Sequence, residues 1–192
     1  MTRRAPRPIS DHLAWAQWWA FPWKPSHQSW RSAERFPAID ALERIASRLP
    51  KTIAAIAPCL PPAPQPTEVR LALASTEQLN LMLALLHTTC RPEDAAPISK
   101  SHHQWCIGLS KALPPDMLLH KDDPLQLLRS WVKPDTWQRL RLRFPCERVL
   151  EMEKNTLSLE HGNSRLNTLW QAIVWRATAT PHAPPGSHEQ GA

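Results

Sequence analysis

The side chains best suited to bind a metal ion lie between residues 87 and 120. His102 and Cys106 stand four residues apart, which places both on one face of a helix, as in a chelating pair. The other candidates in this stretch are His87, Cys90, His103 and His120. A zinc site takes four ligands in recognised paired spacing, and these spacings are irregular. We therefore expect a buried thiol near surface imidazoles, and neither a metal site nor a cofactor.

Side chains for nucleophilic or acid–base catalysis do not form a familiar pattern. The chain has no Gly-x-Ser-x-Gly elbow, and its 4 glycines leave no glycine-rich loop for a nucleotide phosphate. The acidic pairs Asp122/Asp123 and Glu151/Glu153 are typical of helix caps and solubilising charge. The sequence predicts a protein that is not an enzyme and has no small-molecule substrate.

An aromatic residue and alternating cations lie together near residue 140. Trp137 is followed by Arg139, Arg141 and Arg143, a mixture that can stack on bases and neutralise phosphates. The chain carries 23 Lys and Arg against 17 Asp and Glu. Residues 129–148 hold six basic and two acidic groups, as do residues 1–35. Such patches favour nucleic acid, an anionic lipid surface or an acidic protein, or they form a solvated basic face.

Tryptophan is unusually concentrated at the start of the chain. The chain has 10 Trp beside 3 Phe and no Tyr. Five of the tryptophans fall within the first thirty residues: Trp15, Trp18, Trp19, Trp23 and Trp30. Tryptophan is enriched where proteins bind one another, so part of this surface is interpreted as covered by a partner. The competing interpretation is that these rings complete the domain's own core.

The four cysteines and the hydropathy pattern indicate a compartment. Cys59, Cys90, Cys106 and Cys146 form no Cys-x-x-Cys pair and are interpreted as separate buried thiols in a reducing cytoplasm. No secretory signal is recognised and no run of about 18 apolar residues occurs. We expect contact with a membrane only through partner proteins.

Apolar spacing and capping residues predict a series of short helices. Ser75 with Gln78 resembles a capping box, and Asp123 followed by Pro124 is typical of a helix start. The expected helices cover residues 10–21, 37–49, 67–90 with a new start at 75, 99–113, 125–132, 146–154 and 164–177. Residues 135–145 fit a strand or a helix, and we favour a helix because no second strand is evident to pair with.

Length and composition favour one all-α domain. The 192 residues suit a single compact multi-helix unit, and the 21 prolines keep its helices short. The expected organisation has five parts. These are a basic, Trp-rich N-terminal segment (1–36), a helical segment (37–57), a Pro-rich spacer (58–66), a main helical domain (67–178) and a disordered tail (179–192).

Three segments resemble a known family. The segment WQRLRLRFP (137–145) is similar to the Trp-x-x-Arg-Leu-x-Leu-Arg-apolar-Pro pattern of the K component of type III secretion systems, the SctK (YscK) family. DPLQLLRSWV (123–132) resembles that family's Pro-Leu-Gln-x-Leu helix. RLNTLWQAIVWR (165–176) resembles the variant of Hrp-type systems. The resemblance extends over residues 123–176.

This resemblance implies a helical, cytoplasmic and non-enzymatic adaptor of the secretion sorting platform. Such proteins link the cytoplasmic domain of the inner-membrane ring protein SctD to the platform protein SctQ. SctQ in turn connects to the SctL stator and the SctN ATPase. The implied location is the cytoplasmic face of the inner membrane, reached through the secretion apparatus, and the family has no catalytic residues to transfer.

Eight side chains are candidates for contact with partners. They are Trp18, Trp19, Trp137, Arg139, Arg141, Arg143, Trp175 and Arg176. The arginines of the basic strip are expected to touch an acidic partner surface. We expect Trp170 in the core, with Trp175 and Arg176 exposed. The alternative function is a nucleic-acid-binding helical module that uses the Arg139, Arg141 and Arg143 strip.

Overall fold

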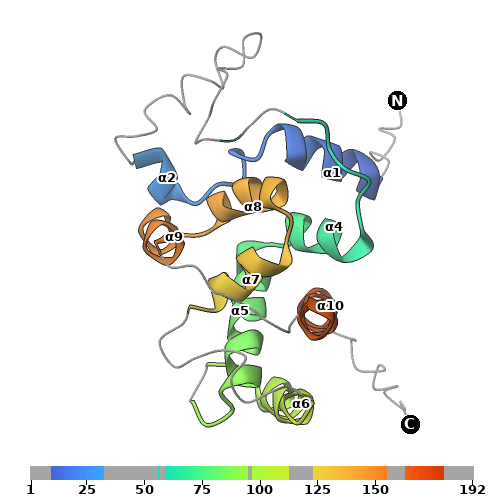
Figure 1. Ribbon diagram of the computed structural model, residues 1–192, viewed down its shortest axis with the longest axis vertical. Coiled ribbons are helices and arrows are strands. Elements are labelled where there is room, and N and C mark those ends of the chain that lie inside the picture. Colours follow the sequence, from blue (N-terminus) through green and yellow to red (C-terminus); the bar gives the residue numbers. More distant parts are fainter. Residues whose placement is uncertain are drawn as a thin grey trace, which may run out of the picture.

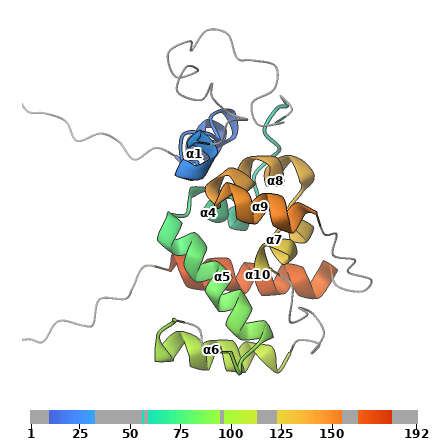
Figure 2. The same cartoon turned by 90° about the vertical axis from the view of Figure 1, so that its left-hand side faces the viewer.

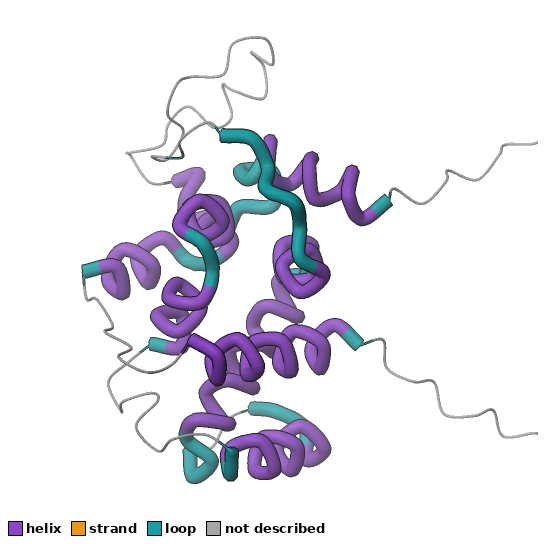
Figure 3. The backbone as a smooth tube through the Cα atoms, turned by 45° about the vertical axis from the view of Figure 1, so that its right-hand side comes forward, coloured by secondary structure: helices purple, strands orange, loops and turns teal. Residues whose placement is uncertain are grey.

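The computed structural model describes residues 10–32, 56, 59–94, 97–112, 123–154 and 163–179. All regular elements within these ranges are helices, as the tube in Figure 3 makes plain, so the all-α prediction is confirmed. They are α1 (Asp11–Ala20), α2 (Gln28–Ser32), α4 (Pro66–Leu73), α5 (Thr76–Cys90), α6 (Lys100–Ser110), α7 (Pro124–Trp131), α8 (Pro134–Leu140), the 3-10 turn η1 (Arg141–Arg143), α9 (Cys146–Glu153) and α10 (Asn163–Thr178).

Local hydrogen bonds set the helix starts where the sequence predicts them. The Ser10 hydroxyl accepts from the Leu13 N–H at the start of α1. Ser75 accepts from Gln78 N–H at 3.2 Å, and the Gln78 side chain accepts from Ser75 N–H at 2.8 Å, so the capping box of α5 is confirmed. Asp123 accepts from Leu125 N–H with Pro124 in the first turn of α7.

The ambiguous stretch after residue 134 is helical. It forms α8 and then η1, which ends at the extended residue Phe144. Trp137, Leu140 and Phe144 are all buried, in agreement with the one helical face expected for them. The helix prediction for residues 135–145 is therefore confirmed as far as residue 143.

The helices pack as one unit around α5, α7 and α10. Helix α5 contacts α6, α7 and α10, and α10 also packs against α4 and α7. In Figure 1, α1 lies at one end with α8 and α4 next to it, whereas α6 lies at the opposite end. Figure 2, a quarter turn away, shows α10 running between α6 and the layer of α8 and α9. The two ends of the molecule are thus joined through the central helices.

The N-terminal tryptophans belong to this core. Trp15, Trp18 and Trp19 form one cluster, in which the Trp15 ring centre lies 5.2 Å from that of Trp18 and 5.5 Å from that of Trp19. Trp23 and Trp30 are buried as well. The interpretation that a partner covers these rings is therefore wrong, and the alternative, that they complete the domain's own core, is confirmed.

The Pro-rich segment is attached to α1. The indole N–H of Trp15 donates to the Pro62 carbonyl at 3.3 Å, and that of Trp19 donates to the Cys59 carbonyl at 2.9 Å. Residues 59–65 hold no helix, as expected, whereas Pro66 is the first residue of α4. The segment thus ties the N-terminal part to the main body instead of separating them.

The cysteines are free thiols in three different environments. Cys106 and Cys146 are buried and Cys90 is partly buried, but Cys59 is exposed. The expectation of four buried thiols is wrong for Cys59, because the Pro-rich segment that carries it lies on the surface of α1. The predicted helix over 37–49 and the tail beyond residue 179 lie outside the described residues.

Candidate functional site

Arg139 is a buried link between α8, α1 and the Pro-rich segment. Its Nε donates to the Trp19 carbonyl at 3.1 Å, and one terminal nitrogen donates to the Asp135 carbonyl at 2.9 Å. The other lies 3.5 Å from the Cys59 sulfur. The guanidinium stacks on the Trp19 ring, 3.9 Å from its centre. Only 3% of Arg139 is exposed, and this burial lowers the pKa of its guanidinium.

Arg143 closes the end of α4. Its two terminal nitrogens donate to the carbonyls of Ala72 and Ala74, at 3.2 and 2.7 Å. Carbonyls at a helix C-terminus have no partner within the helix and carry partial negative charge, so a guanidinium is well suited to them. Arg143 is 8% exposed, and burial lowers its pKa too.

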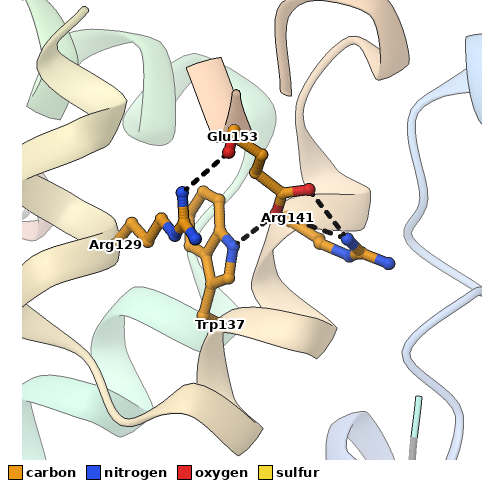
Figure 4. A network of polar contacts seen from close by, with 4 residues as sticks. All are labelled: Arg129, Trp137, Arg141 and Glu153. Atoms are coloured by element: carbon orange, nitrogen blue, oxygen red, sulfur yellow. Dashed lines mark hydrogen bonds and ion pairs between the residues drawn. The ribbon is translucent and has the colours of Figure 1, made fainter. Parts of the chain in front are cut away.

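Trp137 and Arg141 meet at one carboxylate, shown in Figure 4. Glu153 at the end of α9 accepts from the Trp137 indole N–H at 2.7 Å and from Arg141 at 3.0 Å. The Glu153 backbone carbonyl accepts from Arg129 at 3.5 Å. Trp137 is buried and Arg141 is largely shielded, with 14% of its side chain exposed. This network joins α7, α8 and α9.

The expected exposed basic strip is therefore not formed. Arg139 and Arg143 point inward to backbone carbonyls, and Arg141 is paired with Glu153. The prediction that the strip touches an acidic partner is therefore wrong for Arg139 and Arg143, because their guanidinium groups donate to acceptors inside the fold. The nucleic-acid alternative depends on the exposure of the same three arginines, and two of them are buried.

Sequence reasoning missed the role of Glu153. It interpreted this residue as solubilising charge, whereas the carboxylate is the hub of the network. The signal is its spacing. Glu153 follows Val149 by four residues, and Val149 is on the buried face of α9. A helix carries residues i and i+4 on the same face, so Glu153 had to point inward.

On α10 the expectations for Trp170 and Trp175 are confirmed, whereas the expected exposure of Arg176 is wrong. Trp170 is fully buried, and its indole N–H donates to the Leu127 carbonyl. Trp175 is 47% exposed, the one exposed tryptophan of the ten, all of which the structure describes. The Arg70 guanidinium lies 3.6 Å from the centre of the Trp175 ring. Arg176 is half-buried, and it donates to the Ser101 hydroxyl of α6 at 3.0 Å.

Two hollows have Leu73, the last residue of α4, in their walls. The first, the Trp175 groove, has a volume of about 460 Å³ and is lined by Asp11, His12, Arg70, Leu73 and Trp175 among others. The second, the Phe21 groove, has a volume of about 450 Å³ and includes Trp18, Phe21, Lys24, Leu73 and Arg143 in its lining. The shared Leu73 is 41% exposed. Trp18 and Arg143, though buried, thus form part of a groove wall.

The histidine and cysteine candidates that the structure describes form no metal-binding group. No group of three or more His, Cys, Asp or Glu side chains able to hold a metal ion occurs among the described residues. The Cys106 thiol instead donates to the Leu85 carbonyl, and burial raises its pKa. Burial also raises the pKa of Cys90, to about 11. His120 and Asp122 lie outside the described residues.

None of the described helices is by itself long and apolar enough to cross a membrane. Helices α4 and α5 reach that length and composition only as a pair, and they are bent by 118° at the break between them.

Comparison with protein-family models, with curated proteins and with solved structures gave no match to this chain. The case for a function therefore depends on the residues and on the surfaces described above.

Proposed function

We propose that this protein is a non-enzymatic adaptor of a type III secretion sorting platform. It links the cytoplasmic domain of an SctD-type ring protein to an SctQ-type platform protein, and through SctQ it reaches the SctL stator and the SctN ATPase. It acts without a cofactor at the cytoplasmic face of the inner membrane, where its partners hold it. The resemblance of residues 123–132, 137–145 and 165–176 to the SctK family supports this assignment.

The observation that carries the proposal is the exposed Trp175 beside Leu73. Nine of the ten tryptophans are buried or partly buried, and Trp175 alone lies open, stacked on Arg70. Tryptophan and arginine are the residues most often found at the centre of protein–protein interfaces. An adaptor needs such a preformed anchor on a rigid element, and α10 is fixed by its packing against α4, α5 and α7.

The family-like segment 137–145 takes an indirect part in this function. Its arginines bond to α1, to the end of α4 and to α9, so they help to position α1 and α4, which line the Trp175 groove opposite α10. Substitutions in this segment are expected to abolish partner binding by unfolding the chain. They are unsuitable as tests of the contact itself.

Co-purification with SctQ-type and SctD-type proteins encoded beside the gene tests the proposal. Trp175→Ala removes the exposed ring, whereas Leu150→Ala removes an exposed apolar side chain on α9 and serves as the matched control. Loss of a central interface tryptophan costs about 2 kcal/mol or more, so the Trp175→Ala variant should bind at least about 30-fold more weakly to one partner. The Leu150→Ala variant should bind as the wild type does.

Two negative results have different meanings. If the wild-type chain binds neither partner, the adaptor function is wrong. If it binds both and Trp175→Ala changes neither affinity, the function stands and the assignment of the surface is wrong. Both conclusions require that the two variants are folded, which is checked by circular dichroism spectra that match the wild type.

A further inference from the structure

The Pro-rich segment has a backbone that its own residues restrict to one conformation. Each of residues 60–65 is a proline or stands directly before one. Proline fixes its own φ near about −65°, and it drives the preceding residue out of the α region into an extended conformation. Residues 59–65 accordingly form no helix or strand, and Gln65 has a φ of −82° and a ψ of 143°. These restrictions produce a polyproline II helix, which has three residues per turn.

Helix α1 holds this segment from one side. The indole N–H groups of Trp19 and Trp15 donate to the carbonyls of Cys59 and Pro62, which stand three residues apart. Carbonyls at that spacing point in the same direction in a polyproline II helix, and tryptophans four residues apart share one face of an α-helix. Figure 1 shows the segment running from α1 to the start of α4. The segment is thus fixed along one side only.

The side chains on the rest of the segment are apolar and open to solvent. Leu60 is 91% exposed, which makes it the most exposed large apolar side chain of the described residues. Pro61 and Ala63 are exposed as well, whereas Pro62 and Pro64 are half-buried. Residues 60–64, here called the proline ridge, therefore present apolar side chains on a backbone that is already ordered.

The chemistry of the proline ridge indicates which kind of surface it fits. Pro61 and Pro64 form a Pro-x-x-Pro pattern, and such segments dock into grooves lined by aromatic side chains because the polyproline II backbone loses little entropy on binding. Residues 59–65 contain no Lys, Arg, Asp or Glu. A nucleic acid or an anionic membrane is recognised through charge, so neither is favoured here.

We propose that the proline ridge binds an aromatic-lined groove of a partner protein, of the kind that SH3 domains carry. Leu60 and Pro61 make the contact, and α1 holds the ridge beforehand in the bound conformation, which lowers the entropic cost of association. The inference goes beyond the adaptor function by adding a second docking surface. Pro64 also lines the Trp175 groove, so the two surfaces adjoin, but Leu60 and Pro61 are not in that lining.

A panel of purified, fluorescently labelled SH3 domains, titrated with the full-length protein, tests this inference by fluorescence anisotropy. We expect at least one domain to bind. Leu60→Ala and Pro61→Ala should each weaken that binding at least about tenfold, because they remove the apolar contact. Absence of binding across the panel, or equal affinity for the wild type and both variants, would overturn the proposal.

Leu150→Ala and Pro25→Ala are the matched controls, since they make the same two changes at exposed residues outside the ridge. Each should leave the affinity within about twofold, with circular dichroism spectra of all variants equal to that of the wild type. A wild-type dimer that Leu60→Ala converts to a monomer in sedimentation velocity would assign the ridge to a second copy of this chain and refute the proposal.

A synthetic peptide of residues 58–66 tests whether α1 presents the ridge. The free peptide should bind the same SH3 domain about tenfold more weakly than the full-length protein, because nothing orders it beforehand. Tighter binding by the peptide would mean that α1 hides the ridge, which contradicts the proposal.

The SH3 experiment is independent of the secretion partners. Trp175→Ala should leave SH3 binding unchanged. Failure of SctQ-type and SctD-type proteins to co-purify would remove the adaptor function and leave the binding of the ridge intact. Failure of SH3 binding would remove the ridge assignment and leave co-purification intact.

Discussion

The arginines near residue 140 act as internal cross-links because of what each guanidinium meets. Arg139 and Arg143 donate to backbone carbonyls, and Arg141 donates to Glu153. A guanidinium offers five N–H donors in a rigid plane, so one side chain can serve acceptors from several segments at once. Lysine, with a single compact ammonium, cannot reproduce this geometry.

Replacement of Arg139 should therefore destabilise the fold strongly. Arg139→Met keeps the aliphatic stem but leaves the carbonyls of Trp19 and Asp135 without that donor and removes the stacking on the Trp19 ring. We expect a loss of about 2–4 kcal/mol in the free energy of unfolding. Urea denaturation followed by circular dichroism measures it.

Arg148→Met is the control for this change. Arg148 pairs with Asp123 at 2.7 Å, but 38% of its side chain is exposed, and such pairs are worth under about 1 kcal/mol. Equal losses for the two variants would mean that Arg139 contributes no more than a surface ion pair.

The sequence could not show which arginines are buried. The sequence shows that charged residues alternate near residue 140. It does not show their acceptors, which are the carbonyls of Trp19, Ala72 and Ala74, far away along the chain. Only the folded arrangement brings donor and acceptor together. The exposure of Trp175 could be predicted, because helical spacing from the buried Trp170 places it on another face of α10.

The thiols should react with an alkylating reagent in a fixed order. Cys59 is exposed, whereas burial raises the pKa of Cys90 to about 11. At pH 8 a thiol with that pKa is ionised in roughly one molecule in a thousand, and the thiolate is the reactive form. We expect iodoacetamide to modify Cys59 first, with Cys90 and Cys106 labelled quickly only after urea is added.

Peptide mapping by mass spectrometry reads this order. The buried Cys146 serves as an internal reference for a protected thiol. Modification of Cys90 in the native protein as fast as Cys59 would contradict the assigned burial.

The helix ends show what local sequence can specify. A capping box needs only Ser75, Gln78 and the backbone between them, so the start of α5 could be predicted without knowledge of the fold. The same holds for Asp123 and Pro124 at α7. The neighbours of each helix could not be predicted in this way. Nothing local in α1 indicates that it packs against α4 and the Pro-rich segment.

Loss of the α5 cap should lower the free energy of unfolding by a modest but measurable amount. Ser75→Ala removes the acceptor for the Gln78 N–H and should lower the free energy of unfolding by about 1 kcal/mol. Ser110→Ala in the last turn of α6 is the control, because that hydroxyl donates to the Ile107 carbonyl and is exposed. Its change should stay within about 0.5 kcal/mol. If the Ser75→Ala and Ser110→Ala variants unfold at the same urea concentration, the cap does not stabilise α5.

The whole molecule is held together by contacts between its first and last thirds. The indole N–H of Trp30 donates to the Phe144 carbonyl at 2.7 Å, and the backbone N–H of His27 donates to the Leu142 carbonyl at 2.7 Å. The Ser29 hydroxyl accepts from the Cys146 N–H. Composition alone marks residues 1–36 as distinct, because tryptophan and basic residues gather there. These pairings, which link residues more than a hundred positions apart, make the segment part of one packed unit.

The unit should consequently unfold as a whole. Trp30 is 1% exposed, and Trp30→Ala should lower the free energy of unfolding by about 3–5 kcal/mol. If folding is cooperative, this loss accelerates amide hydrogen exchange in α5 and α10 as well as in α2. Trp175→Ala, at an exposed position, should leave exchange in α5 close to that of the wild type. Faster exchange confined to α1 and α2 would mean that the N-terminal segment unfolds independently, and that the long-range pairings with residues 142–146 do not couple it to the central helices.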